Sequence, residues 1–328
     1  MIDLQNIRSA LTSADEETRR SALYALRAGA VPEKQALLFT AMGDESWRVR
    51  KEAVESYVHA LPDRDSVVLL LELLRNEDNA GLRNSAAEAA IRLGSLSAPV
   101  LIDMIDDGDA DVRKFIMDIM GAIGDPVFVP LLLRSLHDPD VNVASTAAEQ
   151  LGALGDTDVA EQLMQALFLR DEMLFRFSVL GALGLLAKPL PIPCDLVQLA
   201  DQEIYRKAVY DCLGAISDVN ALEPLLNGLS CRQKNSRAAA LKALYKIYRR
   251  SSPAARGTVQ GALRLLAEHE IIVGLLELFD SDAGVLAEAL LWASEMIEDS
   301  RFIPLISQHS DEDPDDRLAR CRRAWNAV

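Results

Sequence analysis

Aromatic residues are scarce in this chain, making up 5% of its 328 residues. Alanine, leucine and valine recur throughout instead. Small and medium aliphatic side chains suit closely packed helices better than a β-sandwich, which favours aromatic and β-branched residues. The alternation of polar and apolar residues that marks β-strands is also missing. These absences predict an all-α fold.

Long apolar runs are absent as well. No stretch approaches the roughly 18 apolar residues that a membrane-spanning helix needs. The first residues, MIDLQNIRSALTSADEE, lack the basic and apolar regions of a secretory signal. We therefore expect a soluble protein of the cytoplasm.

Metal-binding and nucleophilic motifs are missing too. The cysteines show no C-x-x-C spacing, and the four histidines lie far apart in the sequence. Only His269 has a glutamate beside it, and one such pair cannot supply the ligands of a metal centre. No phosphate-binding glycine loop or serine elbow occurs. We expect no cofactor, no metal and no enzymatic activity, and we expect reduced thiols at Cys194, Cys212, Cys231 and Cys321 that pack as small apolar side chains.

Basic residues are outnumbered, with 34 lysines and arginines against 50 aspartates and glutamates and a formal net charge of −16. An acidic surface repels phosphate backbones and anionic membranes. Only short basic runs occur, at 248–250 and 317–323. Neither nucleic acid nor a membrane is therefore expected as a partner.

A repeat runs through the chain. Its clearest copy is the string from Asp109 to Asp125, in which a Val-Arg pair is followed by an Ile-Gly-Asp tail. The arginine position recurs after 31 residues, for example from Arg19 to Arg50. This period accommodates two helices of about 11–14 residues and two turns. One unit is predicted to have a first helix over 126–136, a turn over 137–140 and a second helix over 141–154.

The repeated string resembles the HEAT-repeat family, specifically the short bacterial repeats of phycobilisome-lyase-like proteins, over nearly the whole chain. The resemblance implies an α-solenoid, or superhelix, of about ten helix-pair repeats whose second helices line a concave face. It also implies that the repeat arginine of each second helix bonds an aspartate or carbonyl of the preceding turn. The repeat arginines are Arg19, Arg50, Arg83, Arg113, Arg206, Arg237 and Arg317.

Two units depart from the pattern. In the sixth, Met173 stands at the predicted arginine position, and the proline segment 188–193 follows, which cannot continue a helix. We interpret this segment as a kink between an amino-terminal HEAT segment, 1–187, and a carboxy-terminal one, 188–328. In the ninth unit Ala287 stands at the arginine position, and an extra helix is predicted near 254–267.

The turn of 100° per residue assigns the faces of the second helices. Counted from the arginine, positions −1, +3, +7 and +10 form the buried stripe, as in Val49, Ala53, Tyr57 and Ala60. Position +5 faces the opposite way, into the expected groove, beside a partly basic row at +1. We call the +5 row the concave ladder: Tyr24, Glu55, Glu88, Asp118, Glu149 and Asp211.

Two interpretations of the concave ladder are open. In one, it is an ordinary solvated face with i,i+4 pairs such as Lys51–Glu55. In the other, it binds a basic or helical protein whose cations relieve the repulsion between stacked carboxylates. A second candidate surface is an apolar patch of Phe168, Phe175 and Phe177, whose rings could instead fill space in the core.

The sequence thus predicts a non-enzymatic protein-binding scaffold or adaptor that uses the concave face. Family association alone places it in bacterial signalling or regulation. The alternative is a lyase-like or enzyme-accessory protein that handles a cofactor or chromophore for a partner. Trp47 is predicted to lie in a turn, as an anchor for a partner or a cap over the core.

Overall fold

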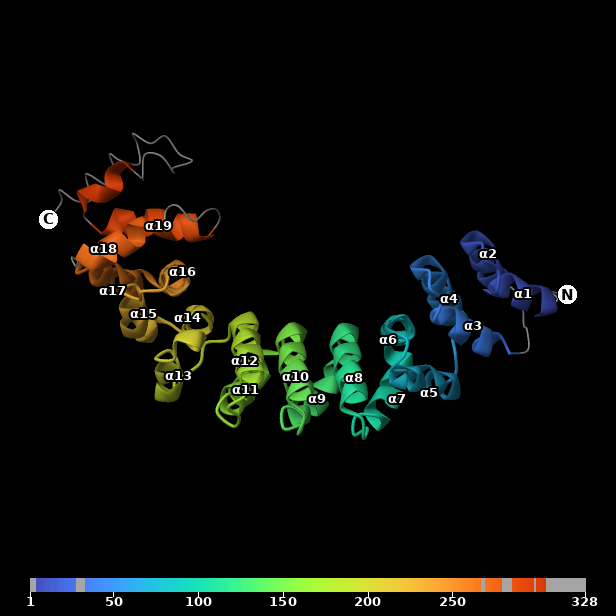
Figure 1. The fold of residues 1–328 in the computed structure, drawn as a ribbon. Helices are drawn as coiled ribbons and strands as arrows, with labels where there is room; N and C mark the ends of the chain where they lie inside the picture. The colour runs from blue at the N-terminus through green and yellow to red at the C-terminus, as the bar shows by residue number, and fades with distance from the viewer. Residues whose placement is uncertain (1–3, 28–32, 267–268, 279–284, 298, 305–328) are drawn as a thin grey trace. The chain divides into compact units, whose positions relative to one another are not determined.

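The computed structural model describes residues 4–27, 33–266, 269–278, 285–297 and 299–304. The regular secondary structure of these residues is helical, and no β-strand occurs among them. The helices follow one another in pairs that stack along the chain (Figure 1), so the predicted α-solenoid is confirmed.

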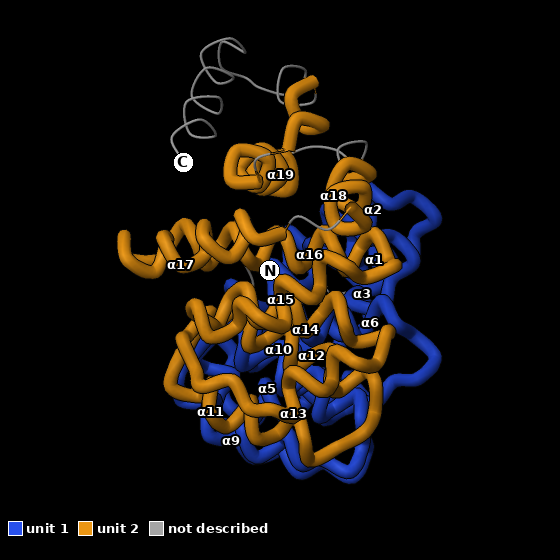
Figure 2. Tube along the Cα trace, turned by 90° about the vertical axis from the view of Figure 1, so that its left-hand side faces the viewer, with its two compact units in different colours: residues 1–154 blue, residues 155–328 orange. Residues whose placement is uncertain are grey.

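The chain divides into two compact units, residues 1–154 and 155–328 (Figure 2). The boundary that the prolines suggested, at 187/188, therefore lies inside the second unit. The segment 188–193 joins α12 (Met173–Leu186) to α13 (Cys194–Leu199), and the Leu190 N–H donates to the Ile216 carbonyl at 3.0 Å. Because α12 still packs on α14 (Glu203–Ile216), the stacking of second helices continues past the prolines.

Unit 1 contains five helix pairs among the described residues. Each second helix packs on the next one along the chain, so the second helices form one layer (Figure 1). The first helices are α1 (Leu4–Leu11), α3 (Lys34–Met42), α5 (Arg64–Glu72), α7 (Ala98–Asp103) and α9 (Val129–Ser135). The second helices are α2 (Glu16–Arg27), α4 (Trp47–His59), α6 (Ala80–Leu93), α8 (Ala110–Ile123) and α10 (Val141–Leu154). The bounds of α10 are those predicted for the second helix of that unit.

Unit 2 contains four further pairs and one additional helix in the part of the chain that is described. The additional helix, α17 (Pro253–Arg264), confirms the extra helix predicted near 254–267. A tenth unit, around Arg317, lies outside the described residues. The first helices are α11 (Ala160–Ala166), α13, α15 (Leu222–Gly228) and α18 (His269–Leu276); the second helices are α12, α14, α16 (Lys234–Arg250) and α19 (Val285–Met296).

Local sequence determines where the helices begin and end. Side chains cap the first turns of several helices: Ser46 accepts a hydrogen bond from the Arg48 N–H, and Asp109 accepts one from the Asp111 N–H. At the other end, Gly124 after α8 has a φ of 73°, which costs glycine little because it has no Cβ. The acidic tail that follows is also explained, because Asp125 caps the next short helical turn, Pro126–Phe128.

The predicted buried stripe is present in the second helices. Val49, Ala53 and Tyr57 are at most 2% exposed. Ala60 is exposed, and its assignment to the stripe is wrong because it forms the C-cap of α4. Position +4 is buried as well, as at Val54, because each second helix also packs against its neighbours in the layer.

The sixth repeat has its arginine three residues later than predicted. Arg176 is the fourth residue of α12, as Arg113 is the fourth residue of α8. The Arg176 Nε donates to the Arg170 carbonyl at 3.0 Å, and Arg113 makes the same six-residue step back to Asp107. The assignment of Met173 to the arginine position is therefore wrong.

Candidate functional site: the second-helix surface

The repeat arginines connect successive repeats. Arg113 Nε and Nη2 donate to the two carboxylate oxygens of Asp138, each at 2.8 Å, and its Nη1 donates to the Asp107 carbonyl at 2.8 Å. Asp138 lies in the turn of the following repeat, whereas Asp107 precedes α8. This hydrogen-bonded carboxylate raises the pKa of Arg113. Arg19 makes the same bidentate contact with Asp44.

Other repeat arginines keep the bond to the preceding turn and vary the second contact. The carbonyl acceptors lie six residues before Arg50, Arg206 and Arg237. The Arg206 Nη1 adds a hydrogen bond to the Gln233 side chain at 2.9 Å. Arg83 departs from the pattern, because its buried Nε has no hydrogen-bond partner and its guanidinium lies 5.6 Å from the centre of the Phe115 ring.

The concave ladder lies on the second helices, but its first carboxylate is already paired. Glu55 accepts a hydrogen bond from Arg92 of α6 at 2.6 Å. This guanidinium holds the pKa of the Glu55 carboxyl below its usual range. Glu88 lies 4.0 Å from the same arginine. Arg92 of α6 thus forms ion pairs with two members of the ladder.

Two further ladder carboxylates have partners within the chain. Asp118 accepts from the Lys114 ammonium at 2.9 Å and from the Gln150 amide of α10 at 3.1 Å. In unit 2, Asp211 accepts from Lys207 at 2.7 Å. Compensated carboxylates do not need a partner's cations, and these contacts favour the solvated-face interpretation.

The two remaining ladder residues are exposed. Glu149 lies on α10, and Tyr24, on α2, is 68% exposed. The neighbouring +1 row also differs from the prediction at one place, since Ser145 is buried rather than exposed. The ladder is therefore not a uniform acidic row, and it begins with an exposed aromatic ring.

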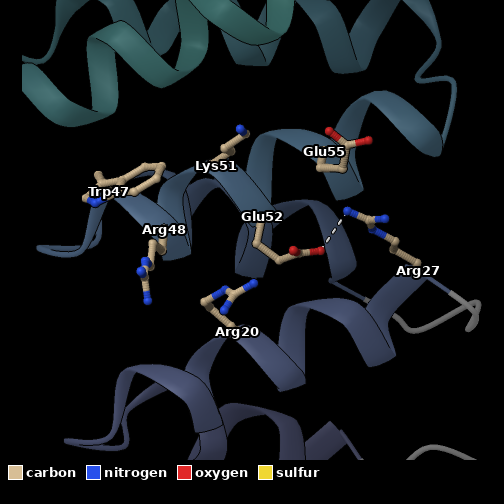
Figure 3. A pocket seen from close by; sticks show the side chains of 7 residues that line it. All are labelled: Arg20, Arg27, Trp47, Arg48, Lys51, Glu52 and Glu55. Carbon is tan, nitrogen blue, oxygen red and sulfur yellow. Dashed lines mark hydrogen bonds and ion pairs between the residues drawn. The ribbon is translucent and has the colours of Figure 1, made fainter.

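An open cavity of about 560 Å³ lies between α2 and α4 (Figure 3). Two of its side chains come from α2 and five from α4. Its lining is Arg20, Arg27, Trp47, Arg48, Lys51, Glu52 and Glu55.

Both carboxylates of the cavity are engaged by arginines of the chain. Glu52 accepts from Arg27 at 2.6 Å, as the dashed line in Figure 3 shows, and Glu55 accepts from Arg92. Lys51, by contrast, forms no hydrogen bond or ion pair among the described residues, and its charge only adds to the influence of Arg92 that lowers the pKa of Glu55. The cavity thus combines neutralised carboxylates with an unpaired ammonium group.

The remaining cations of the cavity pair with carboxylates at the surface of α2, one exposed and one half-buried. Arg20 lies 2.8 Å from Glu17, and Arg48 lies 3.5 Å from Glu16. Both glutamates stand in the first turn of α2. Exposed ion pairs of this kind contribute about 0–1 kcal/mol to stability, so a ligand can readily exchange with them.

Among the described residues, Trp47 is the one aromatic side chain in the lining of this cavity, and a second exposed ring, Tyr24, lies against Arg27, which is also a lining residue. Trp47 is 61% exposed and Tyr24 is 68% exposed. The Arg48 guanidinium lies 5.9 Å from the Trp47 ring centre, and Arg27 lies 5.5 Å from that of Tyr24. Trp47 was predicted in a turn, but it is the first residue of α4, directly after the cap Ser46.

The three phenylalanines of the predicted apolar patch do not form one exposed surface. Phe168 is 36% exposed, whereas Phe175 is fully buried. Phe175 occupies position −1 before Arg176, the position at which Val49 and Val112 are buried in other repeats. Phe177 is half-buried and packs against Tyr205 with ring centres 5.3 Å apart.

Groups suited to metal binding or nucleophilic chemistry are not gathered in the described residues. No cluster of three histidine, cysteine, aspartate or glutamate side chains there is arranged to hold a metal ion. Burial raises the pKa of the Cys212 thiol to about 12. Cys194 is exposed, which contradicts its expected packing as a small apolar side chain, and Cys321 lies outside the described residues. Within the same residues, no helix has the length and apolar character needed to cross a bilayer.

Comparisons with known proteins agree with this geometry. The family model described as HEAT repeats matches residues 4–91 and 98–184. Among curated proteins, none matches this sequence. The chain is similar to solved structures of importin beta, at 15% identity and a TM-score of 0.54, and of Kap121p bound to Pho4p, at 15% identity and a TM-score of 0.58.

These similarities cover 98% of this chain but only 51% of importin beta and 41% of Kap121p. A third structure, of Kap95p with RanGDP, gives a TM-score of 0.55 at 13% identity and is covered over 49% of its length. The chain thus spans about half or less of each structure it resembles. At such identities the likeness concerns the fold alone.

Proposed function

The chain belongs to the HEAT-repeat family, and on that premise we propose that it is a protein-binding scaffold that holds a partner on the second-helix surface of unit 1. The observation that carries the proposal is the exposure of two aromatic rings: Trp47 lines the cavity between α2 and α4, and Tyr24 lies against the lining residue Arg27. Large aromatic side chains are the residues that most often supply binding energy at protein interfaces.

The exposure of these rings is unusual for this chain. Aromatic residues make up 5% of the sequence, and three phenylalanines, at 128, 175 and 302, are among its largest fully buried side chains. Tyr24 and Trp47 instead stand on neighbouring second helices, each with an arginine beside its ring. An aromatic ring with a nearby cation offers both apolar area and a polar contact to a partner.

The concave ladder takes a secondary place in this proposal. Glu55 and Asp118 are compensated within unit 1, and Asp211 is compensated within unit 2. A basic partner would have to displace those contacts before gaining from the carboxylates. The proposed contact is therefore centred on the aromatic rings rather than on the acidic row.

We further propose that the scaffold acts without catalysis in bacterial signalling or regulation, in the cytoplasm. Support for a bacterial role comes from the short, alanine-rich repeats. Similar folds have been solved with protein partners, as the complex of Kap121p with Pho4p illustrates.

The test is affinity capture with matched variants. We expect the Tyr24→Ser/Trp47→Ser double variant to lose at least one protein that the wild-type chain captures from a lysate of its source cells. The control is Leu69→Ser/Val127→Ser, which removes two apolar side chains of similar exposure from other elements of unit 1. Quantitative mass spectrometry compares the three captures. Identical captures by the two double variants would contradict the proposal.

A further inference from the structure

We infer that the partner segment held between α2 and α4 is an acidic peptide carrying an aromatic or leucine side chain. This inference rests on the proposed function and names the chemistry of the segment that the cavity accepts. The charge of this segment is opposite in sign to that expected from the concave ladder, which would favour a basic partner.

The charges of the cavity favour an acidic ligand. Four of its seven lining residues are cationic, in a chain whose formal net charge is −16. Both of its carboxylates already accept hydrogen bonds from arginines. Lys51 forms no ion pair or hydrogen bond among the described residues, and its ammonium group is the first available contact for an incoming carboxylate.

Two arginines of the cavity form ion pairs that a ligand carboxylate can replace. The side chain of Arg48 is 57% exposed and 3.5 Å from Glu16, while the side chain of Glu17 is 67% exposed and 2.8 Å from Arg20. Solvent weakens such pairs, so a ligand carboxylate can replace a glutamate at little cost. Arg48 and Arg20 can then add charge-assisted hydrogen bonds to the contact made by Lys51.

The exposed aromatic rings favour a ligand that also has an apolar side chain. Trp47 lines the cavity, and Tyr24 lies one turn before Arg27, another lining residue. An apolar side chain of the ligand that packs on Trp47 removes exposed apolar surface from water. The cavity volume of about 560 Å³ accommodates a few side chains, as a short linear segment would present them.

The extent of the cationic surface distinguishes a short peptide from a nucleic acid. The cations lie on two adjacent helices, whereas position +5 of the next second helices carries Glu88, Asp118 and Glu149. Screening limits the repulsion that a short acidic peptide feels from these groups, since the Debye length is about 8 Å at physiological salt. A nucleic acid strand that continued along the described layer of unit 1 would meet no further unpaired cation at position +1, where α6 has Asn84, α8 has Lys114 paired with Asp118, and α10 has the buried Ser145.

The experiment is selection from a displayed library of random peptides on the immobilised full-length chain. We expect the selected sequences to be enriched in aspartate and glutamate around an aromatic residue or leucine. Enrichment of lysine and arginine, or selection of apolar sequences without acidic residues, would overturn the inference. Tighter binding of a single-stranded oligonucleotide than of the selected peptide, measured in the same buffer, would also overturn it.

Charge-reversal variants then locate the binding. Arg48→Glu/Lys51→Glu should weaken binding of a selected acidic peptide by about tenfold or more. The matched control, Lys114→Glu/Lys207→Glu, changes the net charge equally at +1 positions of other second helices and should change binding by less than about twofold. If the two double variants weaken peptide binding equally, the overall charge of the chain is the cause and the inference is wrong. Unchanged denaturation midpoints establish that the variants fold.

The two tests fail separately. If Tyr24 and Trp47 are needed for capture while the charge reversals leave the captured partner bound, the proposed function stands and the acidic-peptide inference is wrong. If the charge reversals release a selected peptide but the aromatic variant captures the same proteins as the wild type, the cavity binds acidic peptides and the proposed scaffold surface is wrong.

Discussion

Replacing Arg113 by alanine is expected to lower the free energy of unfolding by about 2–3 kcal/mol. The side chains of Arg113 and Asp138 are 12% and 10% exposed, so the lost bidentate pair leaves a largely buried carboxylate without its cation. The same change frees the Asp107 carbonyl. The measurement is the urea midpoint, with the slope of the transition as a check on cooperativity.

The neighbouring Lys114 provides the matched control. It also forms an ion pair, with Asp118, but both side chains are more than 40% exposed and belong to one helix. Lys114→Ala should therefore change stability by about 0.5 kcal/mol or less. Arg113→Lys should recover less than half of the loss, because one ammonium group cannot span three acceptors. Equal midpoints for Arg113→Ala and Lys114→Ala would contradict the repeat register.

Gly214→Ala is expected to destabilise the chain by about 2 kcal/mol, although alanine is the better helix former. A Cβ at Gly214, in α14, would lie 2.7 Å from both the Cα and the Cβ of Ala243 in α16. Backbone cannot move aside as a flexible side chain can, so α14 and α16 must separate. The thermal and urea midpoints of the variant measure the loss.

The control for this change occupies the same register position. Gly184 of α12 lies eight residues after Arg176, as Gly214 lies eight residues after Arg206, but a Cβ there would meet no atom within 4 Å. Gly184→Ala should raise the free energy of unfolding by about 0.5–1 kcal/mol, because it restricts the unfolded chain. The two substitutions should thus shift stability in opposite directions, and shifts of the same sign would refute the packing described for α14 and α16.

Sequence reasoning predicts the fold because the same helix-pair pattern recurs in successive repeats. The string from Asp109 to Asp125 contains a helix cap, a core residue, the arginine and the terminating glycine, and each has a local cause. The register of Arg176 was missed because Ala187, rather than glycine, ends α12. The signal that could have found it is the Phe175-Arg176 pair, which matches Val112-Arg113.

The candidate site was only partly predictable. Position within one helix identified Lys51 and Glu55 as outward-facing, and Trp47 attracted notice as a rare aromatic. Pairing between helices was not visible, because Glu55 and Arg92 are 37 residues apart and meet only when α4 packs on α6. A row of like charges in sequence can therefore become a row of ion pairs in the fold.

The central claim is that a protein partner contacts the surface of α2 and α4, and site-specific photo-crosslinking tests it most directly. Benzoylphenylalanine is placed at Trp47 or Tyr24, and, as the control, at Leu69 of α5, which is 54% exposed. Irradiation in a lysate of the source cells should join the same protein to the chain from positions 47 and 24, and not from position 69. Adducts from position 69 alone would contradict the claim.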